Sequence, residues 1–456
     1  MINQSRFSIV NADVIFTTAG GEAPKAIDIR QNIIQVSFYE HLNKPYIDAS
    51  VALIDDFGLR SSLGTQGTER LRLVIAHAEQ PTLPIIVKTF FFATVKDVQK
   101  TNDRSEILLL DLVEEHVYVD AVKSISRSYE TTLEDMCVGI AQTDLKKTML
   151  KTKQFDGSAQ GERKVVIPYM SPLQAIRWLN DRMTTKTGSP IYIHGDLYGN
   201  ALYIRSLDRL MQAEVINKKL PLRYGDANAC GGNESEAEKM YYEIKRFEEQ
   251  EADNTLTLFE DGAIGSFYEN IDASTGEAYG SHLSVRDILG DFYVNGLIKD
   301  KSLQSIFDPT LEIDGKFADE YNSLNIHQVT SRNTYNQFKS YHDETQLIED
   351  NGNTLFESRL KAKNKVIRQI LKKNRITIEM SGALFFEQQI SPGRRMRILF
   401  LSPNVQGDTR DTTTTFDSRK SGDYLLMATA HTMLQESHKV TCQLVKLSDL
   451  PSDFEL

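Results

Sequence analysis

Two pairs of neighbouring acids are the first candidates for chemistry in this sequence, Asp55–Asp56 and Glu114–Glu115. Glycoside hydrolysis needs two carboxyl groups that face each other across a sugar, about 5 to 9.5 Å apart. Each pair lies at the end of a predicted strand, where neighbouring side chains point to opposite faces. Such a pair does not supply that geometry, so we predict solvated strand ends rather than catalytic residues.

The histidines and cysteines predict no metal site, no cofactor site and no disulfide framework. The nine histidines are scattered without HxH, HExxH or HxxxH spacing, whereas zinc sites are recognised by clustered ligands. The cysteines Cys137, Cys230 and Cys442 lie far apart and form no CxxC pair, which favours assembly in a reducing compartment. The sequence also lacks the GxSxG elbow of serine hydrolases, so we assign no catalytic residue.

Three further features have plainer interpretations than catalysis. Residues 262–266 (Gly-Ala-Ile-Gly-Ser) superficially resemble a glycine-rich phosphate loop but lack GxxxxGK[ST] and GxGxxG, so we predict a turn and a strand start. Trp178 follows a helix start and is expected in the core or at an interface. His431 is expected to pack or to hydrogen-bond rather than to catalyse a reaction.

The elements that would position these residues are mainly strands in the first quarter of the chain. Residues 1–26 are weakly patterned, with a small-residue turn at 19–21, and indicate a short strand or arm. Residues 56–63 can form one helical turn. The strand-like segments, rich in β-branched, aromatic or alternating residues, are 27–39, 47–55, 67–77, 85–98 and 105–114. Short strands at this regular spacing predict a small barrel or sandwich.

The middle of the chain has a mixed pattern. Residues 131–146 predict a helix, and Ser171 can cap a second helix with Pro172 at its first position. Segments 191–194 and 201–204 flank a short loop and predict a hairpin.

Three later segments are less clearly patterned. Residues 225–238 indicate a linker or exposed loop. Periodicity does not decide whether residues 241–249 form a strand or a helix. Residues 277–345 are irregular and rich in Asn, Asp and Ser, so we expect an insertion that packs on the middle of the chain.

The last hundred residues predict one helix followed by strands. Residues 356–373 carry an apolar stripe, and much of the remaining helix surface is basic. A polar loop with four threonines lies at 412–415. The predicted strands are 375–380, 396–400, 421–431 and 440–447.

Composition limits the classes of protein. The chain has 456 residues, enough for about three domains. Its net charge of −11 argues against a surface that wraps nucleic acid, but it is compatible with a channel through which DNA slides. No charged-then-apolar signal opens the sequence, and no apolar run approaches the roughly 20 residues of a membrane helix.

Short motifs give the sequence a family resemblance. Pro392-Gly393 before a strand, then residues 421–425 (Ser-Gly-Asp-Tyr-Leu), Ala430-His431 and a closing strand, resemble the end of baseplate hub proteins of contractile-tailed bacteriophages. The upper part of type VI secretion spike proteins carries a related segment. Residues 54–56 (Ile-Asp-Asp) and 171–176 (Ser-Pro-Leu-Gln-Ala-Ile) resemble parts of the first and second domains of the hub.

The resemblance implies a β-rich α+β fold with two tail-tube-like β-barrel domains and inserted mixed α/β domains. It also implies an internal duplication, favours a strand at 241–249, and makes residues 262–269 the next strand of the second barrel. The implied division is 1–118 (first barrel with an N-terminal arm), 119–235 (middle mixed α+β domain), 236–275 (start of the second barrel), 276–345 (insertion) and 346–456 (remainder of the second barrel).

The resemblance implies a structural virion protein of the tail baseplate, not an enzyme, assembled in the host cytoplasm. A homotrimer would adapt a hexameric tail tube to a trimeric central spike protein, contact other baseplate proteins, and line a channel for DNA without binding it specifically. Because the sequence ends soon after the closing strand, we expect a separate spike chain and no added lytic domain. The alternatives are a hub with peptidoglycan-degrading or peptidase activity and a generic carbohydrate-binding β protein.

The basic face of the helix at 356–373 is unusual in an acidic chain. Charge runs usually face water, which is the simplest interpretation. A second interpretation is a subunit interface that an acidic surface on a neighbouring barrel would attract. Its candidate residues are Arg359, Lys361, Lys365 and Arg368. The third interpretation is DNA binding.

Overall fold

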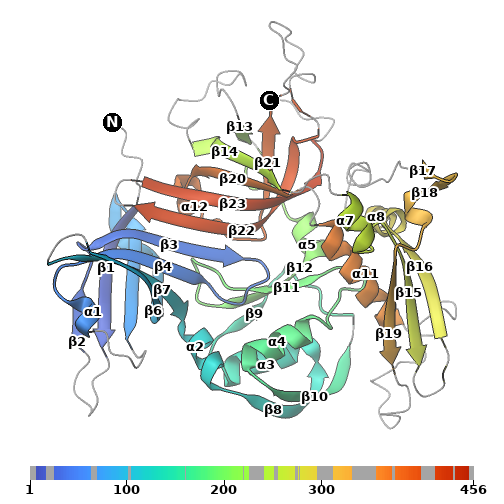
Figure 1. Cartoon of the computed structure of the whole chain (residues 1–456), viewed down its shortest axis with the longest axis horizontal. Helices are drawn as coiled ribbons and strands as arrows, with labels where there is room; N and C mark the ends of the chain where they lie inside the picture. The colour runs from blue at the N-terminus through green and yellow to red at the C-terminus, as the bar shows by residue number, and fades with distance from the viewer. Residues whose placement is uncertain are drawn as a thin grey trace, which may run out of the picture.

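The computed structural model describes residues 7–16, 25–62, 69–100, 104–159, 161–218, 220–224, 241–250, 255–272, 276, 278–294, 312–330, 356–371, 375–401, 416–417, 419–434 and 437–450. Within these ranges, 13 strands form one sheet in the order β2-β1-β5-β6-β7-β4-β3-β22-β21-β13-β14-β20-β23. Figure 1 shows this sheet above a mixed α+β part, with a third part beside it. The predictions for 19–21, 225–238 and 412–415 lie outside the described residues.

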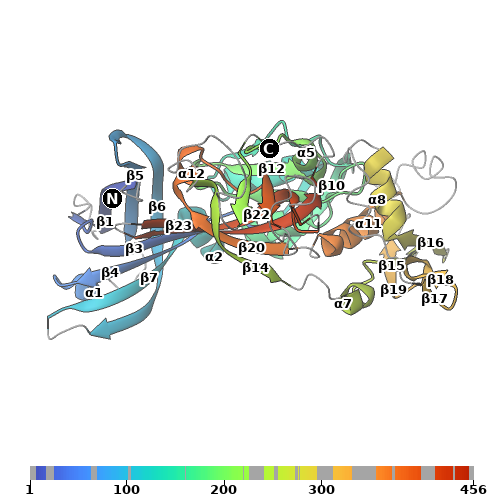
Figure 2. The same cartoon turned by 90° about the horizontal axis from the view of Figure 1, so that it is seen from above.

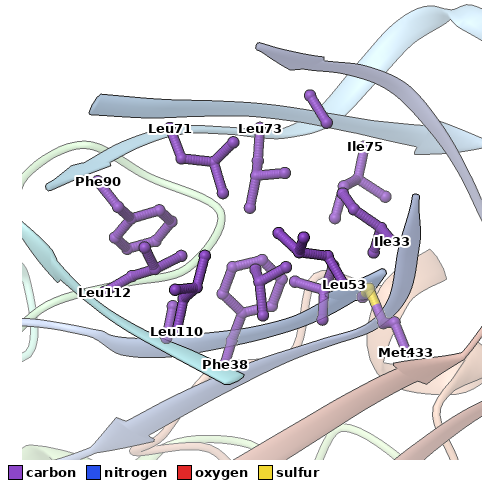
Figure 3. Packing of buried hydrophobic residues seen from close by; sticks show 14 of the residues in the cluster. Ile33, Phe38, Leu53, Leu71, Leu73, Ile75, Phe90, Leu110, Leu112 and Met433 are labelled. Atoms are coloured by element: carbon purple, nitrogen blue, oxygen red, sulfur yellow. The ribbon is translucent and has the colours of Figure 1, made fainter. Parts of the chain in front are cut away.

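The first seven strands of the chain and α1 form what we call the N-terminal module. Strands such as β4 and β5 alternate buried residues with more exposed ones, so each presents an apolar face. Figure 3 shows how the curled sheet encloses these faces, with Leu71 and Leu73 opposite Phe38 and Leu110. The elements are β1 (Phe7–Phe16), β2 (Lys25–Asp28), β3 (Ile33–His41), β4 (Asp48–Asp55), α1 (Leu59–Ser62), β5 (Arg70–His77), β6 (Gln80–Lys100) and β7 (Glu106–Glu114).

The strand predictions for this module are confirmed, with one division. The segment 27–39 forms two strands, β2 and β3, separated by a turn. That turn bridges two strands, because the Ile29 amide donates to Ala12 O of β1 while Asn32 O accepts from the Ile54 amide of β4. The helical turn predicted at 56–63 is α1.

Six strands form a closed mixed barrel. Its order is β22-β21-β13-β14-β20-β23, and pairing between β22 and β23 closes it. Strand β13 runs parallel to both of its neighbours, and the other pairs are antiparallel. The elements are β13 (Leu222–Tyr224), β14 (Glu243–Gln250), β20 (Arg375–Ser381), α12 (Ala383–Glu387), β21 (Arg395–Phe400), β22 (Gly422–Leu434) and β23 (Ser437–Ser448). The strand favoured at 241–249 is thus confirmed as β14.

The closed barrel repeats the strand order of the N-terminal module. The order β5-β6-β7-β4-β3 matches β21-β22-β23-β20-β14, and a short helix follows both β4 and β20. Register shifts also coincide, because β6 shifts against β7 between Phe92 and Thr94 while β22 shifts against β23 between Leu426 and Ala428. A second matching pair of shifts lies in β3 and β14. Bulges are position-specific features, so the backbone itself carries the duplication that the resemblance implied.

The mixed α+β part packs helices α3 and α4 against short sheets. The helices predicted at 131–146 and after Ser171 are α3 and α4, and the Ser171 side chain accepts from the Gln174 amide as a cap. The predicted hairpin is β11 and β12. The elements are α2 (Glu115–Val122), β8 (Ile125–Thr132), α3 (Leu133–Thr143), β9 (Met149–Lys151), β10 (Glu162–Met170), α4 (Pro172–Asn180), β11 (Ile191–His194), β12 (Leu202–Ser206) and α5 (Leu207–Gln212).

One strand predicted for the second barrel, at residues 262–269, lies in the third part of the molecule instead. Residues 262–264 form a turn and β15 starts at Gly265, as predicted, but β15 is not a barrel strand. Its two edges are occupied by its hairpin partner β16 and by β19, and β14 is flanked by β13 and β20 in the barrel. The elements are α7 (Thr255–Glu260), β15 (Gly265–Asp272), β16 (Ala278–Ser284), α8 (Val285–Val294), β17 (Glu312–Ile313), β18 (Lys316–Phe317), a 3-10 turn (Ala318–Glu320), β19 (Leu324–Thr330) and α11 (Phe356–Ile370).

Candidate functional site: a buried polar joint

The N-terminal module and the closed barrel meet along one pair of strands. Strand β3 pairs antiparallel with the second half of β22, from His41 opposite Ala428 to Gln35 opposite Leu434. The loop between β11 and β12, residues 195–200, reaches this strand pair from the mixed part, which lies directly below it in Figure 1. We call β3, β22 and this loop the joint, and residues 195–200 the joint loop.

Glu40 connects the three members of the joint. Its side chain lies on β3 and the residue is 2% exposed. The Leu197 amide of the joint loop donates to Oε1 at 2.7 Å, and the Thr429 hydroxyl of β22 donates to Oε2 at 2.9 Å. Burial, helped by the nearby Asp196 carboxylate, raises the pKa of Glu40 to about 8. At neutral pH the residue is therefore mostly a neutral carboxylic acid.

His431 lies beside Glu40, with 3.8 Å between its Nε2 and Glu40 Oε2, and it packs against a second histidine, His438. His431 is fully buried on β22, its ring stacks on that of His438, and its Nδ1 lies 3.2 Å from His438 Nε2. Burial lowers the pKa of His431 to about 3, and burial also lowers the pKa of His438 well below its usual range. A Cβ on Gly382 would lie 2.4 Å from the His438 ring, so glycine is required there. The packing role expected for His431 is confirmed.

A buried ion cluster holds the joint loop on the side of the N-terminal module. The Lys88 ammonium donates to Asp196 O at 2.8 Å and to Gly199 O at 2.6 Å, and it lies 3.6 Å from Glu114. Lys147 lies 3.0 Å from the same carboxylate. Burial opposes ionisation of Glu114, but the two ammonium groups outweigh it and lower its pKa. The predicted solvated end is therefore wrong for Glu114, which is 4% exposed because two cations offset its desolvation.

The first acid of the other pair is also buried. Asp55 accepts from the Leu59 amide at 2.8 Å and from the Arg60 amide at 2.9 Å, so it satisfies the first free N–H groups of α1. The prediction of solvent exposure is wrong for Asp55 for this reason. It is correct for the second acid of each pair, because Asp56 and Glu115 are exposed.

The joint loop also contacts both β modules. Leu197 is fully buried in the core of the N-terminal module. The Tyr198 hydroxyl donates to Phe385 O of α12 at 3.0 Å, and the Gly195 amide donates to Lys44 O at 3.0 Å. The loop is thus fixed to both β modules at once. The loop therefore links the two modules through buried side-chain and backbone contacts.

Sequence reasoning missed Glu40, Lys88 and Tyr198. A signal was present for Lys88, because Ile86, Lys88 and Phe90 share one parity of a strand and the apolar pair faces the core. A charged residue at a core-facing position predicts a buried ionic contact. Glu40 carried the same signal, since it shares its parity with the buried Val36 and Phe38.

The acid in the Ser-Gly-Asp-Tyr-Leu motif has a structural role in the closed barrel. Asp423 accepts from Arg397 Nε at 2.7 Å and Nη2 at 3.1 Å, and from Arg395 Nη2 at 3.2 Å. Arg395 also donates to Met211 O and Ala213 O, which lie on the chain that leads into β13. The motif therefore joins β21 and β22 to the segment that closes the barrel.

The predicted interface residues on α11 differ in exposure and in contacts. Arg368 donates to Asn364 Oδ1 at 2.8 Å and to Ile191 O at 3.4 Å, so it contacts the mixed part of the same chain. Lys365 is exposed and Lys361 is half-buried. Arg359 lies on α11, but its side chain is outside the described part. The structure thus separates Arg368 from the outward-facing Lys365.

The described residues hold no group of three or more His, Cys, Asp or Glu side chains that could bind a metal ion. Trp178 is half-buried against the core of the mixed part and stacks on Arg182, 3.7 Å from ring centroid to guanidinium carbon. Among the helices that the structure describes, none has the length and apolarity needed to cross a bilayer.

The fold is similar to those of solved tail proteins. The tail protein from Neisseria meningitidis MC58 aligns at 12% identity with a TM-score of 0.50, over 97% of this chain and 97% of that chain. The 43 kDa tail protein of prophage MuSo2 from Shewanella oneidensis aligns at 9% identity with a TM-score of 0.51, over 95% and 98%. A type VI secretion system component from E. coli aligns at 7% identity with a TM-score of 0.40, over 91% and 74%. No family model and no curated protein matches the sequence.

The first two alignments show that this chain has a tail-protein fold over nearly its whole length. The β-rich α+β fold class is confirmed, and one of the two expected barrels closes through strand pairing within the described residues.

Proposed function

We propose that this chain is a structural protein of a phage tail, the baseplate hub that connects a tail tube to a central spike. The observation that carries the proposal is the repeated β module, whose two copies are joined edge to edge through β3 and β22. The tail-protein fold of two solved structures supports it.

The repeat suits a protein that must match two symmetries. Three chains with two similar β modules each place six modules around one axis, which matches a sixfold tube on one side and a threefold spike on the other. In this proposal residues 1–118 form the first tube-like domain. The second combines β13, β14 and residues 375–450, because β15 and α11 lie in the third part. The mixed part, from α2 to α5, and the third part, from α7 to α11, lie outside the ring.

The remaining partners follow from that position. The hub would sit in the virion baseplate, assembled in the host cytoplasm, in contact with the tail tube protein, the spike protein and other baseplate proteins. DNA would pass through its lumen without specific binding, which the net charge of −11 favours. The proposed role is rigid transmission of force, and the joint is the element that supports it.

We propose that the chain is not an enzyme. The acids that could have formed a glycosidase pair are occupied, Asp55 by α1 and Glu114 by Lys88 and Lys147. A hub with lytic activity would instead clear peptidoglycan or cleave peptides in an assay of the purified protein. A carbohydrate-binding β protein would be a monomer that retains glycans on an array.

The outward part of α11 remains our proposal for a subunit contact. Lys361 and Lys365, which are about one turn apart on α11, would face acidic surface of a neighbouring chain together with Arg359, two residues before Lys361. Charge reversal at Lys361 and Lys365 is expected to weaken association without unfolding the chain. The matched control is Lys186→Glu, an exposed lysine of the mixed part. Equal sedimentation of both variants would remove α11 from the interface.

Oligomeric state and particle shape test the proposal directly. Sedimentation equilibrium should give three times the chain mass of 51.7 kDa. Negative-stain images should show a ring with a central channel. A solitary chain at micromolar concentration would contradict the hub assignment.

A further inference from the structure

A cavity lies at the end of the N-terminal module, between α1 and the far end of the β6–β7 hairpin. Its volume is about 440 Å³, and Figure 2 shows α1 beside this end of the hairpin at the extremity of the molecule. Cavities that hold small ligands have volumes of about 300 to 1,000 Å³. The residues that line this cavity lie outside β3, β22 and the joint loop, so it is separate from the joint.

Cations outnumber acids in the lining of this cavity. Arg60, Lys100 and Arg104 bring three positive charges, in a chain whose net charge is −11. Asp55 and Glu106 bring two negative charges. The three cations are exposed, whereas Asp55 is buried and Glu106 is half-buried. The charge that a ligand would meet is therefore mainly positive, which favours an anion.

Both acids of the lining already accept hydrogen bonds within the chain. Asp55 accepts from backbone amides at the start of α1. Glu106 Oε2 accepts from Arg60 Nη1 at 3.2 Å. The second contact shows that a carboxylate fits beside the cations of this cavity, because one already lies there.

The closed barrel shows how the same end of a module can be filled instead. Matching ladder positions relate three residues of the lining to three residues of the barrel: Asp55 to Gly382, Lys100 to Met433 and Glu106 to His438. In the barrel, Phe385 and Phe386 of α12 are buried at this end, and the Phe386 ring packs edge-on against the ring of His438. The repeated fold therefore does not need charged residues here. Their presence in the N-terminal module favours a polar ligand.

We propose that this cavity binds a carboxylate-bearing ligand from outside the chain, with its negative charge held by Lys100, Arg60 and Arg104. Ammonium and guanidinium groups bind carboxylates through charge-assisted hydrogen bonds. Lys100 is the main contact, because Arg60 is shared with Glu106 and Arg104 has another contact within the chain. A free organic acid and an acidic side chain of a neighbouring protein present the same group. The inference goes beyond the proposed hub function and does not depend on the oligomeric state.

Binding of an acidic peptide to the purified chain tests the proposal. Triglutamate that carries a neutral dye should bind at low ionic strength, where charges are least screened, and triglutamine with the same dye should not. Fluorescence anisotropy measures both. Lys100→Gln should weaken binding about 2- to 5-fold, the effect of one exposed ion pair. The matched control is Lys96→Gln, an exposed lysine of the same strand that lies 3.5 Å from Asp111 outside the cavity, and it should leave binding unchanged.

Glu106→Gln should have the opposite effect. It removes the carboxylate that competes with the ligand for Arg60, so triglutamate should bind more tightly by a similar factor. A purely structural role of Glu106 would not raise the affinity. Circular dichroism of each variant checks that the fold is retained.

Competition with citrate identifies the source of the carboxylate. Displacement of triglutamate by citrate at a similar concentration would support a free organic acid, and binding that resists citrate would support a segment of a neighbouring protein. Equal affinity for triglutamate and triglutamine, or equal losses in Lys96→Gln and Lys100→Gln, would overturn the proposed site. Neither result would affect the hub assignment, which depends on the oligomeric state.

Discussion

The N-terminal module and the closed barrel share a strand order, but different strands pair with the edges of the repeated sheet in each. In the barrel, the three-residue strand β13 fits between β14 and β21 and closes the ring of strands. In the N-terminal module, β1 and β2 extend the sheet beyond β5 instead, and the turn at 29–32 bridges back to β4. The same backbone repeat therefore yields one module that closes into a barrel and one whose described strands form an open sheet.

Equivalent residues differ in burial for the same reason. Asp423 and Arg397 face each other in the barrel, and their counterparts in the N-terminal module are Thr89 and Arg72. The barrel pair is buried under the chain that leads into β13, whereas Thr89 and Arg72 are exposed. At this pair of positions, the added closing strand rather than the repeat determines whether the charges are buried.

The largest expected effect on the free energy of unfolding is at Asp423, where the two modules differ. Asp423→Asn leaves the buried guanidinium groups of Arg395 and Arg397 without their carboxylate and should cost about 3 to 5 kcal/mol in the free energy of unfolding. Thr89→Ala at the equivalent position should cost no more than about 0.5 kcal/mol. Urea unfolding followed by circular dichroism measures both. Equal losses would contradict the difference between the modules.

Leu197→Ala tests whether the N-terminal module depends on the joint loop. Removal of a fully buried leucine should cost about 2 to 5 kcal/mol. If the joint loop stabilises mainly the N-terminal module, amide hydrogen exchange should rise in β3 and β4 before it rises in β20. Uniform loss of protection in both modules would show that they unfold as one unit.

Glu40→Gln should make the stability of the joint less dependent on pH. The pKa of Glu40 is raised to about 8 in the folded chain, so the unfolded chain loses this proton first as pH rises above its ordinary value near 4.5. Wild-type stability therefore falls between about pH 5 and pH 8 by about 2 to 4 kcal/mol through this group alone. Midpoints of urea unfolding for both proteins across that range measure the difference, which should grow with pH in favour of Glu40→Gln. Parallel pH profiles would contradict a buried neutral acid.

Tyr198→Phe should give the smallest effect. It removes one hydrogen bond, from the hydroxyl to Phe385 O, and leaves the ring in place, so a loss of about 1 kcal/mol is expected. Because this bond ties the joint loop to the barrel, the variant should loosen α12 rather than β4 in hydrogen exchange. A change confined to β4 would reverse the assignment of that anchor.

Local patterns were sufficient for most elements and insufficient for the joint. The alternation at Arg70–Ile75 predicts β5, and the Ser171-Pro172 start predicts α4, because each depends on neighbouring residues alone. Strand β13 has three residues and no readable period. The apolar residues after Gly265 are compatible with either sheet. Strand β15 lies outside the barrel because β13 and β20 flank β14 there, which the local pattern does not reveal.

The burial of Glu114 was missed because it is stabilised by a group that the sequence does not place beside it, Lys147, 33 positions away. Asp55 differs, because its partners are the nearby amides of Leu59 and Arg60 at the start of α1. The hydrogen bond between Thr429 and Glu40 joins residues 389 positions apart. A strand pattern predicts which face is apolar, but it does not predict which distant partner neutralises a charge on that face.

That long separation has a consequence for how the chain matures. Synthesis proceeds from the N-terminus at about 5 to 20 residues per second. Strand β3 therefore emerges from the ribosome well before β22, the strand that covers its outer edge. During this interval the nascent protein presents an unpaired edge with the apolar Val36 and Phe38 beside it, and such edges recruit one another. Strand β22 thus completes the N-terminal module, although the residues it contacts there, such as Glu40, lie as far as 389 positions before it. A product truncated before β22 should therefore be insoluble rather than partly folded.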